Sequence, residues 1–257
     1  MAAEDHKKVL WMGAALMALA MLMAVADPAH ADSRIRAGNC KVYQTVVLDP
    51  IAATTHLHSF TGGTVTSNAT TGFDLEAAAT TSCNVADNWA TSALWFPRAQ
   101  TFTATKDTLY YRDPGDQNNL MPIPTDLRLL SMTVIFRGTN TSVRFPNCLA
   151  VDSTTGEPVL DSIDHMSHTY DARAKACPAA FPYRIPQPAI LIHWPQSLQP
   201  STPISEGSGL FGQASTSFHA DYLAGNQAEF NDTLIDLCLN NVPASTKVAD
   251  PACGLEP

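Results

Sequence analysis

The stretch CKVYQTVVL, residues 40–48, decides the fold, because it is rich in β-branched and aromatic side chains and stops at Asp49-Pro50. Such residues suit the pleated surface of a sheet and predict a strand. Similar stretches recur between clusters of Pro, Gly, Asn and Asp, at residues 101–105, 108–112, 127–137 and 189–194. Helical patterns are sparse, with a turn or two in residues 86–94 and one amphipathic helix in residues 226–240. We therefore expect a mainly β fold, a single-domain β-sandwich or jelly-roll-like fold with long disulfide-tied loops and few short helices.

The overall composition limits the classes of protein to consider. The chain has 257 residues, 45% of them hydrophobic, and 15 Lys and Arg stand against 24 Asp and Glu, which gives a net charge of −9. This hydrophobic share is that of a packed globular protein and excludes a disordered chain. Because the chain is acidic and no stretch collects Lys and Arg, nucleic acid is not an expected partner.

The N-terminus has the layout of a secretory signal peptide. Lys7 and Lys8 precede an apolar run over residues 9–26, and Ala29-His30-Ala31 supplies small residues at a cleavage site. Residues 1–31 are therefore the expected signal peptide, and residues 32–257 the expected single β-rich extracytoplasmic domain. The alternative is an anchor that is kept, because the run is nearly long enough to cross a bilayer. After cleavage we expect no contact with the membrane, and a secreted, periplasmic or cell-surface location.

The number of cysteines indicates that the protein is located in an oxidising compartment. All six lie beyond the expected signal peptide, and an even number in an exported chain predicts up to three disulfides. Sequence alone leaves about 15 pairings open. A cysteine metal cluster would need close C-x-x-C pairs, and the sequence has none.

The histidines fall into three short groups. These are His56-Leu57-His58, Asp164-His165-Met166-Ser167-His168 and Phe218-His219-Ala220-Asp221-Tyr222. An H-x-H pair on a strand places both imidazoles on one face, and an i, i+3 pair shares a face on a helical turn. His193 stands alone in a strand-like run and is expected to be structural.

Imidazole is the commonest metal-binding side chain, and a neighbouring carboxylate can complete or orient the site. We therefore predict that the three groups converge on a divalent ion, zinc or copper, with the ligands His56, His58, His165, His168 and His219. The predicted catalytic residues are Asp164, His165, His168 and Asp221. The alternative is an acid/base site that holds no metal.

The aromatic residues allow two interpretations. The residues concerned are Trp89, Trp95, Trp194, Tyr110 and Tyr111. They could form platforms on which sugar rings stack, but packing in the core is the expected role for most of them. The sequence contains no G-x-S-x-G, no P-loop and no G-x-G-x-x-G, which excludes α/β-hydrolase, NTPase and dinucleotide-binding functions.

At its histidine groups the chain resembles a family of secreted domains of unknown function from fungi and bacteria. In fungi these domains are sometimes joined to WSC or cellulose-binding modules. The matching motifs keep their order along nearly the whole mature chain, and include Asp49-Pro50-Ile51, the HxH pair, Phe145-Pro146-Asn147-Cys148, the DHMSH and FHADY groups, and Gly225. Several aromatic and polar positions of the family pattern differ here, where the chain has Ala90, Leu149, Phe181 and Gln227. The resemblance implies an extracellular polysaccharide setting and brings no established reaction.

Together these observations lead to a functional expectation. We expect a secreted domain that acts on extracellular polysaccharide or another cell-surface glycan as a metal-assisted hydrolase, in which an ion or an imidazole and carboxylate pair activates water. The sequence leaves two alternatives open. One is a non-catalytic extracellular copper- or zinc-binding protein, and the other is a glycan-binding wall module whose histidines are polar loop residues.

Overall fold

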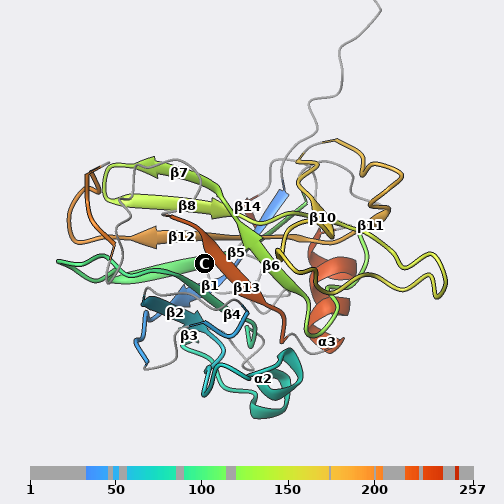
Figure 1. The fold of residues 1–257 in the computed structure, drawn as a ribbon, viewed down its shortest axis with the longest axis horizontal. Helices are drawn as coiled ribbons and strands as arrows, with labels where there is room; N and C mark the ends of the chain where they lie inside the picture. Colours follow the sequence, from blue (N-terminus) through green and yellow to red (C-terminus); the bar gives the residue numbers. More distant parts are fainter. Residues whose placement is uncertain are drawn as a thin grey trace, which may run out of the picture. The chain divides into compact units, whose positions relative to one another are not determined.

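The computed structural model describes residues 33–45, 49–51, 57–84, 90–113, 120–173, 175–199, 201–204, 218–225, 228–239 and 247–248. All of these belong to the compact unit of residues 32–257, which is the unit described below (Figure 1).

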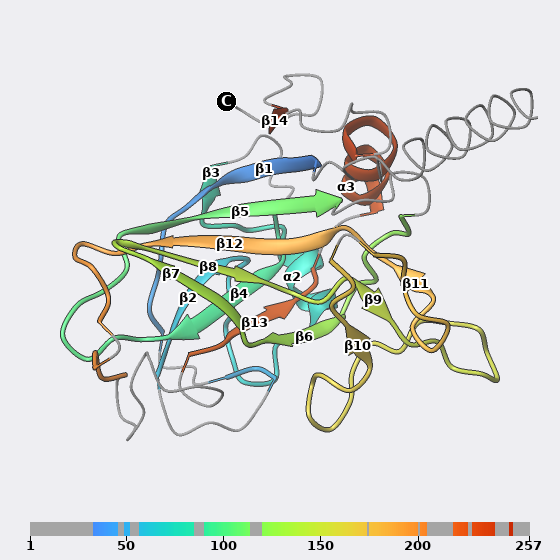
Figure 2. The same cartoon turned by 90° about the horizontal axis from the view of Figure 1, so that it is seen from above.

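The larger sheet has the strand order β14-β1-β5-β12-β8-β7, and β3 pairs with β1 beside this path (Figure 2). Neighbouring strands in this sheet are antiparallel, except for β1 and β14, which are parallel. The strands are β1 (Ser33–Cys40), β3 (Cys83–Asn84), β5 (Lys106–Asp113), β7 (Thr133–Arg137), β8 (Asn140–Arg144), β12 (Gln187–His193) and β14 (Lys247–Val248).

A second, antiparallel sheet has the order β2-β4-β13-β6. Its strands are β2 (His58–Gly62), β4 (Ala93–Pro97), β6 (Arg128–Ser131) and β13 (Ala220–Leu223). One core cluster contains side chains of both sheets, such as Tyr111 and Ile190 from the larger and Phe96 and Tyr222 from the smaller, all fully buried. Two sheets that share one core form a β-sandwich, so the predicted mainly β fold is confirmed.

The smaller sheet also has a covered outer face, and this face positions the candidate site. A second cluster of buried side chains lies there, made of Phe60, Val65, Leu75, Ala93, Trp95 and Leu223. Leu75 comes from helix α2 (Gly72–Ala78), and Tyr43 and Ile51 pack against the same cluster. The outer face of this sheet is therefore an interior surface.

Helix α2 was not predicted, although its sequence holds a start signal. Thr71 and Asp74 form a capping box, in which each side chain accepts a hydrogen bond from the other residue's backbone N–H. The pattern of a Thr followed three residues later by an acidic residue is typical of a helix N-terminus. The predicted helix over 226–240 is confirmed within the described residues as α3 (Ala228–Asp232), followed by a π-helical turn, η2 (Thr233–Leu239).

Loops at one end are held by a small sheet with the order β10-β9-β11. Its strands are β9 (Cys148–Leu149), β10 (Thr169–Tyr170) and β11 (Tyr183–Arg184). The Cys148–Cys177 disulfide closes this region, and Cys40–Cys83 joins β1 to β3. Cys238 is also disulfide-bonded, and Cys253 lies outside the described residues.

The predicted strand boundaries hold in part. Residues 108–112 lie in β5, residues 127–137 contain β6 and β7, and residues 189–194 overlap β12. The bounds predicted for the strand over 40–48 are wrong, because β1 ends at Cys40. Tyr43 forms an isolated bridge with Phe60. Residues 46–48 lie outside the described residues. Residues 101–105 form no strand, and the C-terminal end of the helical stretch at 86–94 is wrong, because Ala93 begins β4.

Candidate metal centre

Three of the predicted site residues meet on the covered outer face of the smaller sheet. In the ladder, Phe60 of β2 lies opposite Trp95 of β4, and Trp95 lies opposite Asp221 of β13. Side chains alternate between the faces of a sheet, so residues two positions apart point the same way. His58 lies two residues before Phe60 and His219 two residues before Asp221, which places both imidazoles and the Asp221 carboxylate on this face.

The geometry of this group is close to a coordination shell. The Nε2 atoms of His58 and His219 lie 3.2 Å apart. The Nε2 atom of His219 lies 3.5 Å from Oδ2 of Asp221. One ligand atom from each residue lies within 4.8 Å of the others. Zinc–ligand bonds of about 2.0–2.2 Å at tetrahedral angles separate two ligand atoms by about 3.3 Å. The two shorter separations match that value.

The group is withdrawn from solvent. The exposed fractions are 0% for His58, 6% for His219 and 0% for Asp221. Neither carboxylate oxygen of Asp221 accepts a hydrogen bond from the described residues. A buried carboxylate without a hydrogen bond is costly unless it is protonated or paired with a cation.

A second buried carboxylate raises the negative charge near the site. Asp49 accepts hydrogen bonds at Oδ1 from the Trp95 indole N–H, at 3.2 Å, and from the Ile51 backbone N–H, at 2.9 Å. Burial raises the pKa of Asp221 well above its ordinary value, and the nearby charge of Asp49 raises it further. Both effects favour the neutral, protonated carboxyl group over a bare carboxylate, and a bound cation would offset them.

The donor set selects the class of ion. Two imidazole nitrogens and one carboxylate oxygen suit Zn²⁺, Cu²⁺ and related transition metals, whereas Ca²⁺ and Mg²⁺ prefer shells of oxygen. Without an ion, a hydrogen bond between the two Nε2 atoms is the alternative arrangement, since 3.2 Å is also a hydrogen-bond length.

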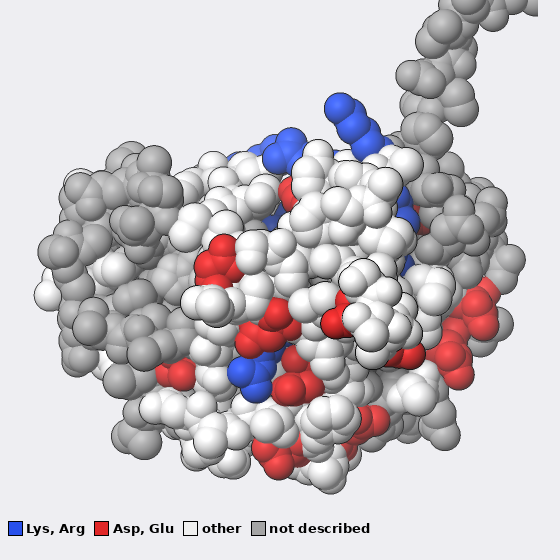
Figure 3. All heavy atoms as spheres, turned by 45° about the vertical axis from the view of Figure 1, so that its right-hand side comes forward, with Lys and Arg blue, Asp and Glu red and all other residues white. Residues whose placement is uncertain are grey.

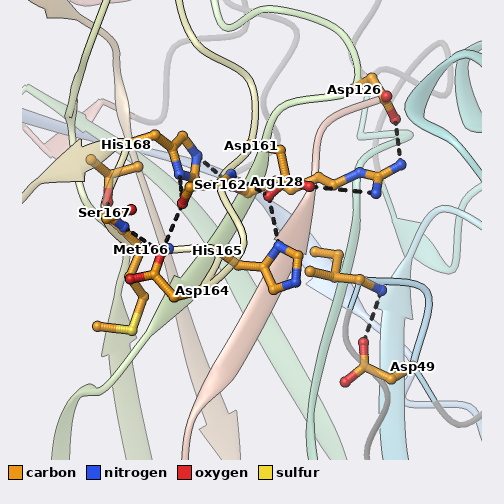
Figure 4. Close-up of polar contacts among 12 residues, drawn as sticks. Asp49, Asp126, Arg128, Asp161, Ser162, Asp164, His165, Met166, Ser167 and His168 are labelled. Carbon is orange, nitrogen blue, oxygen red and sulfur yellow. Dashed lines mark hydrogen bonds and ion pairs between the residues drawn. The ribbon is translucent and has the colours of Figure 1, made fainter.

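The DHMSH group forms a separate polar cluster in a loop (Figure 4). Asp164 accepts hydrogen bonds from the Met166 and Ser167 backbone N–H groups and from the Ser162 hydroxyl. These bonds hold the pKa of Asp164 well below its usual value. The carboxylate thus organises the turn that carries the two histidines.

The two histidines of this loop have defined partners. His165 Nδ1 lies 2.6 Å from Asp161 Oδ1, and His165 has a left-handed backbone conformation with φ of 53°. His168 is buried, its Nε2 lies 2.9 Å from the Arg128 carbonyl oxygen, and its Nδ1 lies 2.8 Å from the Ser162 hydroxyl. Burial lowers the pKa of His168. Both ring nitrogens of His168 are therefore occupied by protein groups.

The loop approaches the smaller sheet through its backbone. The Leu130 N–H donates to the His165 carbonyl oxygen at 3.2 Å, and Leu130 lies opposite Asp221 in the ladder. Neither His165 nor His168 belongs to the ligand group of His58, His219 and Asp221 found among the described residues. The predicted ligand His56 lies outside the described residues.

Two carboxylates near these groups, Asp49 and Asp161, are not among the site residues predicted from the sequence. From the sequence, Asp49 is the residue that ends a strand and part of the Asp49-Pro50-Ile51 motif, and neither the Asp49–Trp95 nor the Asp161–His165 contact is predicted. The Asp49-Pro50 pair is recognisable in the sequence as a motif. Its position near Trp95 and Asp221 depends on how distant segments of the chain pack together, which the local sequence does not show.

The tryptophans do not form exposed platforms in the described part of the chain. Trp95 and Trp194 are buried, and Trp95 stacks on Phe60 with ring centroids 5.5 Å apart. Tyr111 is also buried, while Tyr110 is half-buried on the other sheet. Core packing therefore accounts for Trp95, Trp194 and Tyr111, and Trp89 lies outside the described residues.

The fold and the site together define a disulfide-bonded β-sandwich with a buried His/His/Asp group that could hold a metal ion. Comparison with protein-family models, with curated proteins and with solved structures finds no match to this chain. Among the described residues, no helix is both long and apolar enough to cross a bilayer. Disulfides of this kind persist in oxidising compartments and indicate an extracytoplasmic protein.

Proposed function

We propose that this protein is an extracytoplasmic metalloprotein in which His58, His219 and Asp221 hold one divalent transition-metal ion that activates water for the hydrolysis of glycan. The observation that carries the proposal is the Asp221 carboxylate. It is fully buried, accepts no hydrogen bond from the described residues and lies 3.5 Å from an imidazole nitrogen.

Among the described residues the group offers three protein ligands, and this number favours a reactive ion over a purely structural one. Structural zinc sites are closed by four protein ligands, whereas catalytic sites have three and leave a position for water. Such an ion lowers the pKa of its bound water to about 7, which supplies hydroxide at neutral pH. Asp49, held by Trp95 and Ile51, adds negative charge beside the ligands and strengthens the attraction for a cation.

The glycan part of the proposal rests on the resemblance to secreted domains that accompany cellulose-binding modules. A second candidate, a non-catalytic protein that binds copper or zinc, is favoured by one observation: all three ligands are at most 6% exposed. Substrate has restricted access to a centre that is so deeply buried, whereas a storage or delivery site has no such requirement.

Elemental analysis of the purified full chain, after incubation with Zn²⁺ or Cu²⁺ and removal of the excess, tests the metal site. We expect about one equivalent of ion in the wild type and in His193→Ala, a histidine on the other sheet, and none in His58→Ala. Binding that is absent from the wild type, or unchanged in His58→Ala, contradicts the proposal.

Release of reducing ends from a panel of polysaccharides then separates the two candidates. Turnover that requires the ion and is lost in His58→Ala supports the hydrolase. Tight binding of the ion with no turnover on any glycan selects the metal-binding protein instead.

A further inference from the structure

The outer face of the larger sheet collects positive charge that is scattered along the sequence. In β5, Leu109 and Tyr111 point into the core, so the even-numbered residues point outward. One row of ladder partners runs Arg36, Tyr110, Ala189, Arg144, and a second runs Lys106, His193, Asn140, Arg137. With Arg112, the described side chains of this face include five Lys and Arg residues: Arg36, Lys106, Arg112, Arg137 and Arg144.

Negative charge is absent from the described strand residues on this face. The two carboxylates of β5, Asp107 and Asp113, have odd numbers, are fully buried and point to the core side. The whole chain carries a net charge of −9, so a face of this composition departs strongly from the average. Figure 3 shows acidic side chains spread over one side of the molecule, while most of the Lys and Arg in view lie at its upper rim.

The face is hollowed where the arginines lie. A groove of about 290 Å³ is lined by Ile135, Arg137, Asn140, Ser142, Arg144 and Leu191. A smaller hollow of about 70 Å³ is lined by Tyr110, Arg112, Ala189 and by Ser142, Arg144 and Leu191, which it shares with the groove. The two hollows therefore adjoin each other, and Arg112, Arg137 and Arg144 are among the residues that line them.

The arginines lie close enough to affect one another. Arg112 is only 7% exposed, and burial, together with the charge of Arg144, lowers its pKa to about 10, while Asp171 offsets part of this effect. Holding two like charges near each other costs free energy, and a bound anion relieves that cost.

We propose that this groove is a second binding site, separate from the metal centre, and that it holds an acidic polysaccharide. The guanidinium groups come from three strands, so they match a ligand with several carboxylate or sulfate groups in a row better than a single small anion. Arginine binds carboxylates and sulfates through paired N–H donors. Tyr110 offers a ring to the apolar face of a sugar, and Asn140 and Ser142 offer hydrogen bonds to its hydroxyl groups.

Nucleic acid is the other polyanion to consider, and the remaining surface argues against it. A chain with a net charge of −9 repels a long polyphosphate outside the groove. The disulfides also place the protein where polysaccharides are the abundant polyanions. The proposal does not depend on the function proposed for the metal centre, because the two sites lie on outer faces of different sheets.

Binding of polygalacturonate to the full chain tests the site, with dextran as the neutral comparison. We expect polygalacturonate to bind the wild type, with an affinity that falls as salt rises, and dextran not to bind. The double variant Arg137→Ala/Arg144→Ala is expected to weaken polygalacturonate binding at least about ten-fold. Lys41→Ala/Lys175→Ala, which removes two exposed charges outside the groove, is expected to change it less than about two-fold.

Further measurements keep the outcomes distinct. Thermal unfolding checks that the arginine variants fold, and Arg144→Lys, which keeps the charge but loses the paired donors, is expected to fall between the wild type and the double variant. His58→Ala is expected to bind polygalacturonate as the wild type does, so failure of the metal site leaves this test intact. The proposal is overturned if the wild type does not bind polygalacturonate, if the double variant binds equally well, or if single-stranded DNA or anionic lipid vesicles bind the groove more tightly.

Discussion

The Nε2 atoms of His58 and His219 lie 3.2 Å apart, although 161 positions separate the two residues in the chain. The sheet order explains the meeting, because β2 and the strand that follows His219, β13, flank β4 on either side. Two neutral imidazoles whose lone pairs face each other at this distance repel, so either a proton or a cation must lie between them. Asp221, on the same face, provides the negative charge that favours the cation.

Addition of Zn²⁺ is expected to stabilise the wild type. An ion that binds the folded state but not the unfolded state adds about 2.7 kcal/mol at a hundred-fold excess over its dissociation constant. In a domain of this size that is a rise in Tm of about 5 to 10 °C. Differential scanning calorimetry with and without Zn²⁺ measures the shift, and a chelator should reverse it. A matching rise in His58→Ala would show that the ion binds elsewhere.

Asp221→Asn is expected to separate stability from metal binding. The variant removes a buried carboxyl group whose pKa is raised, so without metal we expect its free energy of unfolding to increase relative to that of the wild type as pH rises from about 4 to about 8. The same variant loses a ligand and should take up little or no ion. Urea unfolding and elemental analysis check the two effects. Asp232→Asn, an exposed carboxylate on α3, serves as the control and should change neither. A variant that is destabilised and still binds the ion would contradict this account of Asp221.

The strands that could be predicted are those whose own side chains fit a sheet. Residues 108–112 and 189–194 alternate or run apolar, and the structure places them in β5 and β12. β1 was missed because its sequence, SRIRAGNC, has few β-branched residues. It is a strand because it pairs with β5, β3 and β14, a tertiary effect that overrides local preference.

The part of the site that could be predicted is the spacing of side chains within each histidine group. The H-x-H and FHADY groups contain His58, His219 and Asp221, which the structure brings together, because a period of two on a strand keeps side chains on one face. From the sequence, His58 and His219 are predicted as ligands and Asp221 as a catalytic residue, and these roles stay predictions. The joining of β2 and β13 across β4, and the position of Asp49 beside Trp95, depend on strand order, which local sequence does not specify. The catalytic roles predicted for Asp164, His165 and His168 stay predictions, now with known partners for each side chain.

Asp107 is expected to make stability depend on pH. Its side chain is fully buried between the sheets and accepts one hydrogen bond, from the Thr61 hydroxyl at 2.9 Å. Burial raises its pKa from 3.8 to about 8. The folded state therefore keeps a proton that the unfolded state releases above pH 4, so the stabilising contribution is complete at acidic pH and is lost as pH rises to 8.

Asp107→Asn removes this dependence. Relative to wild type, the variant should gain on the order of 2 to 5 kcal/mol in free energy of unfolding between pH 4 and pH 8.5. Urea unfolding of both proteins across this range isolates the contribution of Asp107, because every other titrating group is common to both. Parallel curves for the two proteins would mean that Asp107 titrates normally in the folded state.

Asp164 distinguishes a turn-forming role from a catalytic one. Its carboxylate accepts the Met166 and Ser167 backbone N–H groups, and an Asn side chain can accept the same bonds without the charge. Asp164→Asn is therefore expected to keep the loop ordered, whereas Asp164→Ala frees both N–H groups and speeds their amide hydrogen exchange. If the carboxylate acts only on the turn, any glycan hydrolysis or metal uptake survives in Asp164→Asn and declines in Asp164→Ala in step with the loss of protection. If Asp164→Asn abolishes turnover while protection of Met166 and Ser167 is unchanged, the negative charge itself takes part in the reaction.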